Sequence, residues 1–394
     1  MSIEFYLSSF TYLKKKIILI GPAYPYRGGN ALFITHAYES LKNQFDVKIY
    51  NYKLLYPSLL FPGTTQFDQS KEQVFKVPSE RIINSINPFN WLKVAGLLKK
   101  ENADLVVFDW WHPFFGLCHG AISFLIKKKY KNKILFITEN VVSHEANAID
   151  KLLTKIGLTS ASKFLALSGI VEKEVQQFSK GKKVYRSELP VYNCYKQRDL
   201  TDQKGIKKEF GFEDDSIVLL FFGYVRKYKG LDILIEAFPK ILSSNPKARL
   251  LIVGEFYDNP KEYFELIKKL KIENKVKVIN QFVPNESVAK YYQAADVVIL
   301  PYRSATQSGI LNVAYGFNKP VIVTDVGGLA EFVDEGNTGF VVQPNSPEAI
   351  TGGVQKFLSV KEKVDFTTHI NERNRKNSFN QLPEVFEKIL EDNI

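Results

Sequence analysis

The sequence predicts an α/β protein made of two Rossmann-like, doubly wound domains that face each other across a cleft. Two observations predict this fold. Short apolar runs alternate with helical stretches in both halves of the 394-residue chain, and the alternation lapses in a polar segment near residues 190–203. Such alternation implies crossover connections and parallel sheets that are covered by helices on both faces.

The first half begins with an apolar strand, Lys16–Ile20, a loop that contains Gly28 and Gly29, and a helical stretch from Asn30 to Leu41. Apolar runs follow at 47–50, 105–108 and 134–138, and helical patterns at 91–100 and 119–129. We assign residues 1–192 to this N-terminal domain.

The second half repeats the pattern after the polar linker. Its strand candidates and helical stretches assign residues 193–372 to a second domain. Residues 373–394 are expected to form a C-terminal helix that packs back toward the N-terminal domain. The strand candidates are 217–222, 249–253, 276–279, 297–300 and 320–323, and the helical stretches are 231–242, 263–270 and 374–391.

Composition excludes several classes of protein. Cys118 and Cys194 are the only cysteines, which excludes a disulfide framework and a Cys-based metal site and favours a cytoplasmic location. The five histidines show no His-Glu-x-x-His spacing, so no metal is expected. The apolar stretch Phe5–Leu13 precedes three lysines, the reverse of a secretory signal, and no run approaches the roughly 20 apolar residues of a membrane span.

The net charge of +11 lies entirely in the first half. Residues 1–194 hold 26 Lys and Arg against 15 Asp and Glu, whereas residues 195–394 hold 27 of each kind. Two interpretations are open: a solvated basic surface, or a site for an anionic membrane or nucleic acid. The segment 121–126, with Phe124 and Leu125, runs into five lysines between 127 and 133. It is expected either to lie at an anionic membrane surface or to be a core helix with a solvated end.

Two loops of the second half have features of phosphate-binding sites. The Gly223–Gly230 loop joins a strand to a helix and carries Arg226 and Lys229, which are expected to hold a diphosphate unless the loop is only a solvated cationic turn. The Ser304–Gly309 loop precedes a helix near Ile310, whose N-terminus can bind an anion. The alternative for Ser308 is a helix N-cap.

A third loop, 325–331, carries paired glycines that permit a close backbone approach. Because strand-to-helix loops of one parallel sheet open at the same edge, the three loops are expected to share one site.

With these motifs, the stretch from Phe221 to about Val342 resembles the donor domain of retaining glycosyltransferases of family 4, which have the GT-B fold. The resemblance rests on the Gly223–Gly230 loop, the Ala-Ala-Asp-Val run that begins at Ala294, and the stretch 319–328. The first half resembles the family more loosely, through its Gly28-Gly29 loop and through residues 139–145 after the fourth apolar run.

The resemblance implies transfer of a sugar from a nucleoside diphosphate to a hydroxyl acceptor with retention, and neither metal nor cofactor is expected. The acceptor is expected to be a sugar or a lipid-linked sugar in cell-surface polysaccharide or glycolipid synthesis, and the enzyme to be cytoplasmic, peripheral to the membrane and without a nucleic-acid partner. The expected catalytic residues are Glu139, His144, Arg226 and Lys229; the alternatives are a helix cap for Glu139 and an ordinary loop histidine for His144. The expected donor-binding residues are Gly28, Gly29, Gly223, Arg226, Lys229, Phe282, Val283, Thr306, Gln307, Ser308, Gly309 and Glu331.

The chain departs from the family in two ways. The family's Glu-x7-Glu pair is replaced by Ala305 and Val313, and its arginine after the first glycine by Tyr224. The paired glutamates hold the donor sugar and ribose in the family. We therefore expect Thr306, Gln307 or Glu331 to supply replacement hydrogen bonds.

Two other classes of protein were possible from the alternation of strands and helices and from the basic first half. A dinucleotide oxidoreductase is disfavoured because Gly-x-Gly-x-x-Gly is absent after the first strand. A non-catalytic protein that binds nucleotide sugars or nucleic acid remains an alternative, because Trp110, Trp111 and Tyr130 accompany the basic first half.

Overall fold

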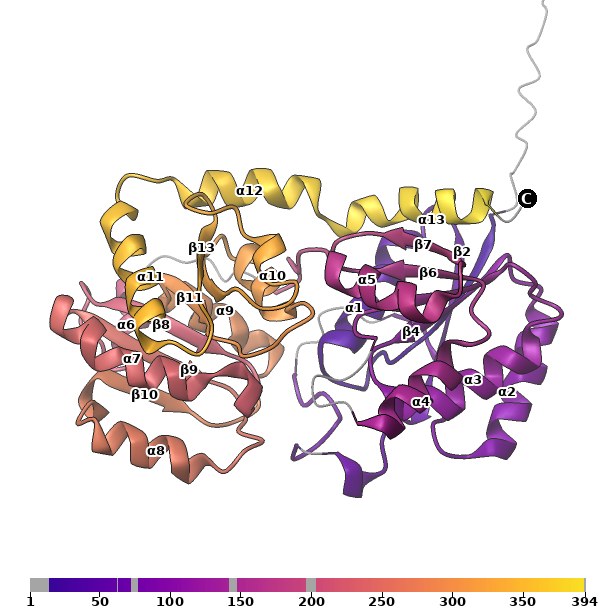
Figure 1. The fold of residues 1–394 in the computed structure, drawn as a ribbon, viewed down its shortest axis with the longest axis horizontal. Helices are drawn as coiled ribbons and strands as arrows, with labels where there is room; N and C mark the ends of the chain where they lie inside the picture. The colour runs from indigo at the N-terminus through magenta and orange to yellow at the C-terminus, as the bar shows by residue number, and fades with distance from the viewer. Residues whose placement is uncertain (1–13, 62, 72–76, 142–146, 196–202, 393–394) are drawn as a thin grey trace, which may run out of the picture.

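The computed structural model describes residues 14–61, 63–71, 77–141, 147–195 and 203–392. These residues form two separate sheets in which every strand pairing is parallel, with orders β3-β2-β1-β4-β5-β6-β7 and β10-β9-β8-β11-β12-β13. Figure 1 shows them side by side, each with its own helices. The predicted fold class, two doubly wound α/β domains, is confirmed.

The first domain contains the seven-stranded sheet. Its strands are β1 (Lys16–Ile20), β2 (Asp46–Leu54), β3 (Glu80–Asn84), β4 (Leu105–Trp110), β5 (Ile134–Thr138), β6 (Lys163–Ala166) and β7 (Lys183–Arg186). Its helices are α1 (Gly29–Leu41), α2 (Pro88–Glu101), α3 (Gly116–Ile126), α4 (Ala148–Leu158) and α5 (Gly169–Ser179), with 3-10 turns η1 (Ser58–Leu60) and η2 (Pro113–Phe115). The central strands are apolar, apart from Lys16, Asp109 and Thr138, because both faces of the sheet are covered.

The second domain contains the six-stranded sheet. Its strands are β8 (Ile217–Phe222), β9 (Ala248–Val253), β10 (Val276–Ile279), β11 (Val297–Leu300), β12 (Val321–Thr324) and β13 (Gly339–Val342). Its helices are α6 (Gln203–Glu209), α7 (Leu231–Ser244), α8 (Pro260–Lys269), α9 (Asn285–Ala294), α10 (Gly309–Gly316) and α11 (Pro347–Val360), with 3-10 turns η3 (Lys227–Lys229), η4 (Glu273–Lys275) and η5 (Ala330–Phe332). No helix in the described ranges is long and apolar enough to cross a bilayer.

The end of the chain crosses back to the first domain. The single helix expected over 374–391 is two helices, α12 (Phe366–Lys376) and α13 (Leu382–Glu391), separated by the turn η6 (Phe379–Gln381). Asn377 donates to Glu188 in the break, and Pro383 lies in the first turn of α13. In Figure 1, α12 lies over the second domain and α13 over the first.

The two faces of the first sheet have different covers. Side chains alternate along β1, so Ile17 packs in one core with α1 and α13, whereas Ile18 packs in another with α2, α3 and α5. Helix α3 lies between α2 and α4 on this second face. The layer formed by α2, α3 and α4 therefore has an inner side on the sheet and an outer side away from it.

Candidate active site

A cavity of about 390 Å³ lies between the two domains. It is bordered by the loops that follow β1 and β5 in the first sheet and β8, β9, β10 and β11 in the second. These loops all leave the carboxyl ends of parallel strands, where α/β sheets bind ligands. The cavity is thus the candidate active site.

Lys229 brings a buried positive charge to this cavity. It ends the turn η3 after β8, and no carboxylate of the described residues forms an ion pair with it. Burial and, to a smaller extent, the nearby Arg226 charge lower the pKa of Lys229 to about 8. A buried cation without a protein anion is costly, so this site favours an anionic ligand.

The start of α10 converges on the same place. A Cβ atom added to Gly223 would lie 3.2 Å from both Lys229 Nζ and Ile310 Cδ1 in the first turn of α10. Ser308 occupies the N-cap position, but its side chain makes no cap bond and lies 3.4 Å from the Tyr302 hydroxyl. The helix N-terminus, the buried hydroxyl groups and the Lys229 ammonium together form an anion site.

Gln307 adds a polar group without a partner. It borders the cavity, and its buried Oε1 atom has no hydrogen-bond partner among the described residues. A ligand hydroxyl or N-H group would satisfy this acceptor.

The paired glycines of the third loop pack against the backbone of the 304–309 loop. Gly327 has a φ of +52°, and a Cβ atom there would meet Ala305 O at 1.5 Å. A Cβ atom on Gly328 would meet Thr306 O at 2.2 Å. The glycines therefore permit a close approach to the 304–309 loop rather than to a ligand.

Most of the other residues predicted to bind the donor also border the cavity. This set, placed at the cavity by the structure, is Gly28, Gly29, Gly223, Phe282, Val283 and Gly309. Ala305 and Val313, which stand where the family carries its glutamates, border it too. The cavity wall is therefore apolar at both of those positions.

Two predicted donor-binding residues lie elsewhere. The Thr306 hydroxyl donates to Asn140 Oδ1 of the first domain, and Glu331 accepts from Gly169 N at 2.9 Å and pairs with Arg186 at 3.1 Å. Neither Thr306 nor Glu331 borders the cavity. The structure thus places both residues at the domain interface, where contacts with the first domain use the Thr306 hydroxyl and Glu331 Oε2, and their roles in donor binding stay predictions.

Arg226 is also displaced from its predicted position. Its side chain is exposed, lies over the Tyr257 ring at 5.9 Å and does not border the cavity. Its charge lowers the pKa values of Lys229 and of His112 in the first domain. Arg226 thus lies near the domain interface but outside the cavity wall, which leaves Lys229 as the cavity cation of this loop.

Arg27 is a cavity residue that the sequence did not reveal. It follows β1, and its side chain, 2% exposed, pairs with Glu255 of the second domain at 2.6 Å. Its guanidinium lies 4.7 Å from the Phe282 ring centroid, and its Nε and Nη1 atoms have no partner among the described residues. The Tyr-Arg-Gly-Gly run was the available signal, but the partner lies 228 residues away.

Glu139 forms a buried acidic pair with Asp109. Burial raises the pKa of Glu139 to about 7, while the Asn30 side chain opposes the rise. Burial and the neighbouring Glu139 raise the pKa of Asp109 well above its ordinary value. Asn140, the next residue along, borders the cavity, but Glu139 does not. His144, the other predicted catalytic residue on the acceptor side, lies outside the described residues.

The acidic pair predicts a pH-dependent stability. The pKa of Glu139 is raised to about 7 from 4.5, so the native state loses stability as pH rises from about 4.5 through about 7. Glu139→Gln is expected to remove this loss and to stabilise the protein at pH 8 by on the order of 1–3 kcal/mol. Thermal unfolding at pH 5, 6, 7 and 8 measures the effect, with the exposed Glu273→Gln as control. A difference from wild type that is the same at every pH would contradict the assignment.

No group of three or more His, Cys, Asp or Glu side chains in the described parts of the chain is arranged to hold a metal ion.

Comparison with known proteins defines the class. The structure is similar to that of Anabaena Alr3699/HepE in complex with UDP, with a TM-score of 0.74 and 16% identity over 96% of this chain and 100% of that chain. The same Anabaena protein in complex with UDP-glucose also gives a TM-score of 0.74 and 16% identity, over 96% of this chain and 99% of that one. The fold is thus that of the GT-B glycosyltransferases.

The sequence comparisons agree with this class. Residues 202–377 match the family Glycosyl transferases group 1. A 154-residue stretch is 34% identical to the uncharacterized glycosyltransferase MJ1607 of Methanocaldococcus jannaschii and covers 39% of this chain and 38% of that protein. The N-acetyl-alpha-D-glucosaminyl L-malate synthase of Bacillus anthracis is 24% identical over 302 residues, 74% of each chain. The match to this family thus covers most of the second domain, and the likeness to the solved structures shows the fold of the whole chain.

Proposed function

We propose that the chain is a glycosyltransferase that moves a sugar from a nucleoside diphosphate to a hydroxyl acceptor with retention of configuration. The observation that carries the proposal is Lys229, a buried cation with no carboxylate partner among the described residues, beside the N-terminus of α10 in the cavity between two parallel sheets. An anion with further oxygen atoms, such as a diphosphate, fits this group of donors.

The similar Anabaena structures contain UDP and UDP-glucose, and we propose the same class of donor for this chain. Gly28 and Gly29 border the cavity from the first domain, where their lack of side chains lets a donor lie close to the backbone. The apolar wall at Ala305 and Val313 leaves Gln307 Oε1 as the free acceptor of the 304–309 loop among the described residues.

The proposed step breaks the bond between the anomeric carbon and the diphosphate oxygen and forms a bond to the acceptor oxygen on the same face of the sugar. The acceptor proton passes to a diphosphate oxygen, so the products are the glycosylated acceptor and a nucleoside diphosphate. Lys229 and the first amides of α10 stabilise the charge that develops on the leaving diphosphate. In this proposal a lysine, and not a metal ion, supplies the positive charge.

The acceptor enters from the first domain, where Asn140 borders the cavity and Glu139 lies behind it. We propose that Glu139 positions Asn140 and that the acceptor is a sugar or a lipid-linked sugar in cell-surface polysaccharide or glycolipid synthesis.

Thermal shift measurements test the donor class. The protein is expected to be stabilised by UDP-sugars or GDP-sugars and not by NAD or a single-stranded oligonucleotide, because ligand binding to the native state raises the melting temperature. Stabilisation by the oligonucleotide alone would favour the alternative, a non-catalytic nucleic-acid-binding protein.

Gln307→Ala is expected to raise the KM for the donor about tenfold with a smaller change in kcat, because a ligand group would lose its hydrogen-bond partner. Steady-state kinetics with varied donor concentration measures both constants. Gln281→Ala is the comparison variant. Gln281 also borders the cavity, but it is exposed and belongs to a different loop. Unchanged constants in Gln307→Ala would place this residue outside the donor site.

A further inference from the structure

Large apolar side chains protrude from the first domain. Of the 13 large apolar residues that are exposed within the described ranges, 12 belong to this domain. Seven of them lie on the layer of α2, α3 and α4, and we call these seven the apolar face. They are Phe89, Leu92, Leu117, Phe124, Ile149, Leu152 and Ile156. Phe89 is 83% exposed and Ile149 is 66% exposed, so these side chains have little contact with their own domain.

The apolar face points away from the sheet. In α3, Ile122 and Ile126 are buried in the core under the layer, whereas Leu117 and Phe124, seven residues apart, are exposed on the other side. Ile122 and Ile126 thus pack as the core-helix interpretation of this segment expects, whereas the membrane-surface interpretation stays a prediction. Figure 1 shows α2, α3 and α4 next to one another at the outer side of the first domain. The outer side of such helices is ordinarily polar, so exposed apolar residues on all three indicate a binding surface.

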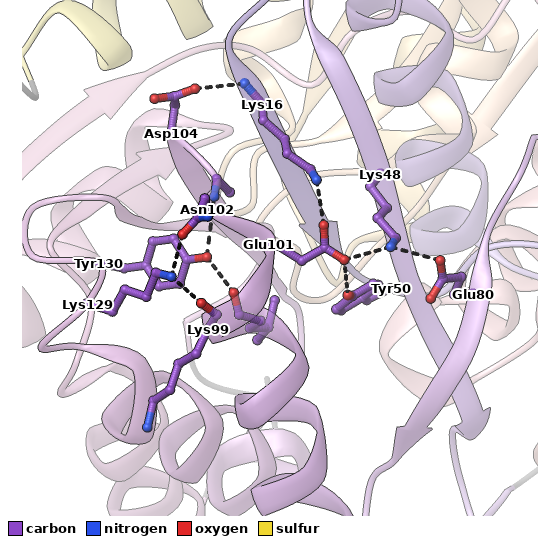
Figure 2. Close-up of polar contacts among 12 residues, drawn as sticks. Lys16, Lys48, Tyr50, Glu80, Lys99, Glu101, Asn102, Asp104, Lys129 and Tyr130 are labelled. Carbon is purple, nitrogen blue, oxygen red and sulfur yellow. Dashed lines mark hydrogen bonds and ion pairs between the residues drawn. The ribbon is translucent and has the colours of Figure 1, made fainter.

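The segments that form this layer and the turn after α3 are rich in positive charge. The stretches 88–101, 116–133 and 148–158 hold ten lysines and two carboxylates. One carboxylate, Glu101, is bound by Lys16 of β1 and by Lys48 and Tyr50 of β2, as Figure 2 shows. The other, Asp150, forms the capping box at the start of α4. The two acidic groups thus have partners within the domain, and the layer as a whole is strongly cationic.

We infer that the layer of α2, α3 and α4 docks on a membrane surface that contains anionic lipids. Apolar side chains enter the boundary between headgroups and acyl chains, and long lysine side chains reach the phosphate groups beside them. The charge is complementary to such a surface, and the apolar residues distinguish it from nucleic acid, whose backbone is contacted mainly by cations and polar groups.

The position of the apolar face relative to the cavity suggests a reason for docking. The segment around η1 connects them. Leu59 is 93% exposed, the Tyr56 and Phe114 ring centroids lie 5.0 Å apart, and the Phe61 ring lies 5.8 Å from the Arg27 guanidinium at the cavity. An acceptor held in the membrane would reach the cavity along this edge. This inference rests on the proposed function and specifies its acceptor as one that is carried by a membrane lipid.

The test measures sedimentation of the full chain with phosphatidylcholine vesicles that contain 0 to 40% phosphatidylglycerol, at low and high salt. One variant combines Leu92→Ser, Phe124→Ser and Leu152→Ser, and a second combines Lys93→Gln, Lys128→Gln and Lys151→Gln. The matched controls are in the second domain. They are Phe264→Ser, at an exposed aromatic residue, and Lys261→Gln, Lys268→Gln and Lys269→Gln together in α8.

Binding is expected to rise with phosphatidylglycerol, to fall at high salt and to weaken at least tenfold in the apolar variant. In the lysine variant it should weaken by about 100-fold, since each cation near an anionic leaflet contributes about fivefold. The controls should bind as wild type does. Donor binding should persist in all variants. Failure of the proposed function would instead appear as an absence of donor binding in the wild-type protein, so the two failures can be told apart.

Three results would overturn the inference. One is equal vesicle binding by wild type and both variants, and a second is binding that is lost only when residues 1–13 are removed. The third is the absence of vesicle binding together with self-association that the apolar variant abolishes, which would assign the face to a second copy of the chain.

Discussion

Replacing Lys229 by Met is expected to lower the rate of sugar transfer by about 10²-fold or more, by analogy with the loss of one oxyanion donor. Lys229 is buried at the cavity beside the start of α10, where little water screens its charge. Transfer kinetics with saturating acceptor measure the loss. The control is Lys227→Met, which removes an exposed cation from the same turn and should leave the rate unchanged. A wild-type rate in Lys229→Met would contradict the assignment.

The same substitution is expected to stabilise the protein. Burial lowers the pKa of Lys229 from 10.5 to about 8, so the charged form is disfavoured in the native state and the cost is present in full below pH 8. That cost falls as pH rises from about 8 to 10.5, because the native state then holds Lys229 in its neutral form while the unfolded chain still holds the proton. Lys229→Met should thus raise stability at pH 7 by up to about 3 kcal/mol. Donor affinity of wild type should decline as pH rises through 8, and the variant should show no such decline.

Replacing Arg27 by Met is expected to reduce kcat/KM by about 10²-fold and to loosen the closed arrangement of the domains. The Arg27 and Glu255 side chains are 2% and 8% exposed and form an ion pair at 2.6 Å across the cavity. Removal of one partner leaves a buried charge without compensation, which costs on the order of 3 kcal/mol. Small-angle scattering should show a larger radius of gyration in Arg27→Met.

A matched control for Arg27 lies within the second domain. Arg249 has a side chain that is 6% exposed and pairs with Glu213 away from the cavity. Arg249→Met should lower the melting temperature without changing the radius of gyration or the KM for the donor. If Arg249→Met and Arg27→Met had the same effects on transfer and shape, the ion pair between Arg27 and Glu255 would have no special role in closure.

The fold could be predicted from the sequence because the central strands carry a local signal. Lys16–Ile20, Ile134–Thr138 and Ile217–Phe222 are apolar along their whole length, or nearly so, and the structure has strands with these same bounds. The edge strands β3, β7 and β13 were missed, whereas the edge strand β10 was predicted as residues 276–279. β7 (Lys183–Arg186) has four residues with a cation at each end, because an edge strand is half exposed and needs no continuous apolar run.

Site residues could be predicted from the sequence where their position depends on a single strand-to-helix loop. Lys229, Gln307 and Ser308 border the cavity because each follows a strand of the same sheet. Residues whose position depends on domain closure were not predictable. Thr306 and Glu331 contact Asn140 and residues of the first domain, so their contacts depend on how two separate sheets meet.

Calorimetric titration of nucleoside diphosphates into the wild-type protein and Lys229→Met at pH 7 tests the central claim most directly. The account predicts that UDP or GDP binds wild type at one site per chain and that Lys229→Met weakens this binding by about 10²-fold, because the diphosphate loses the buried Lys229 charge. If neither nucleotide bound wild type, or if both proteins bound with equal affinity, the cavity between the domains would not be a nucleotide-sugar site held by Lys229.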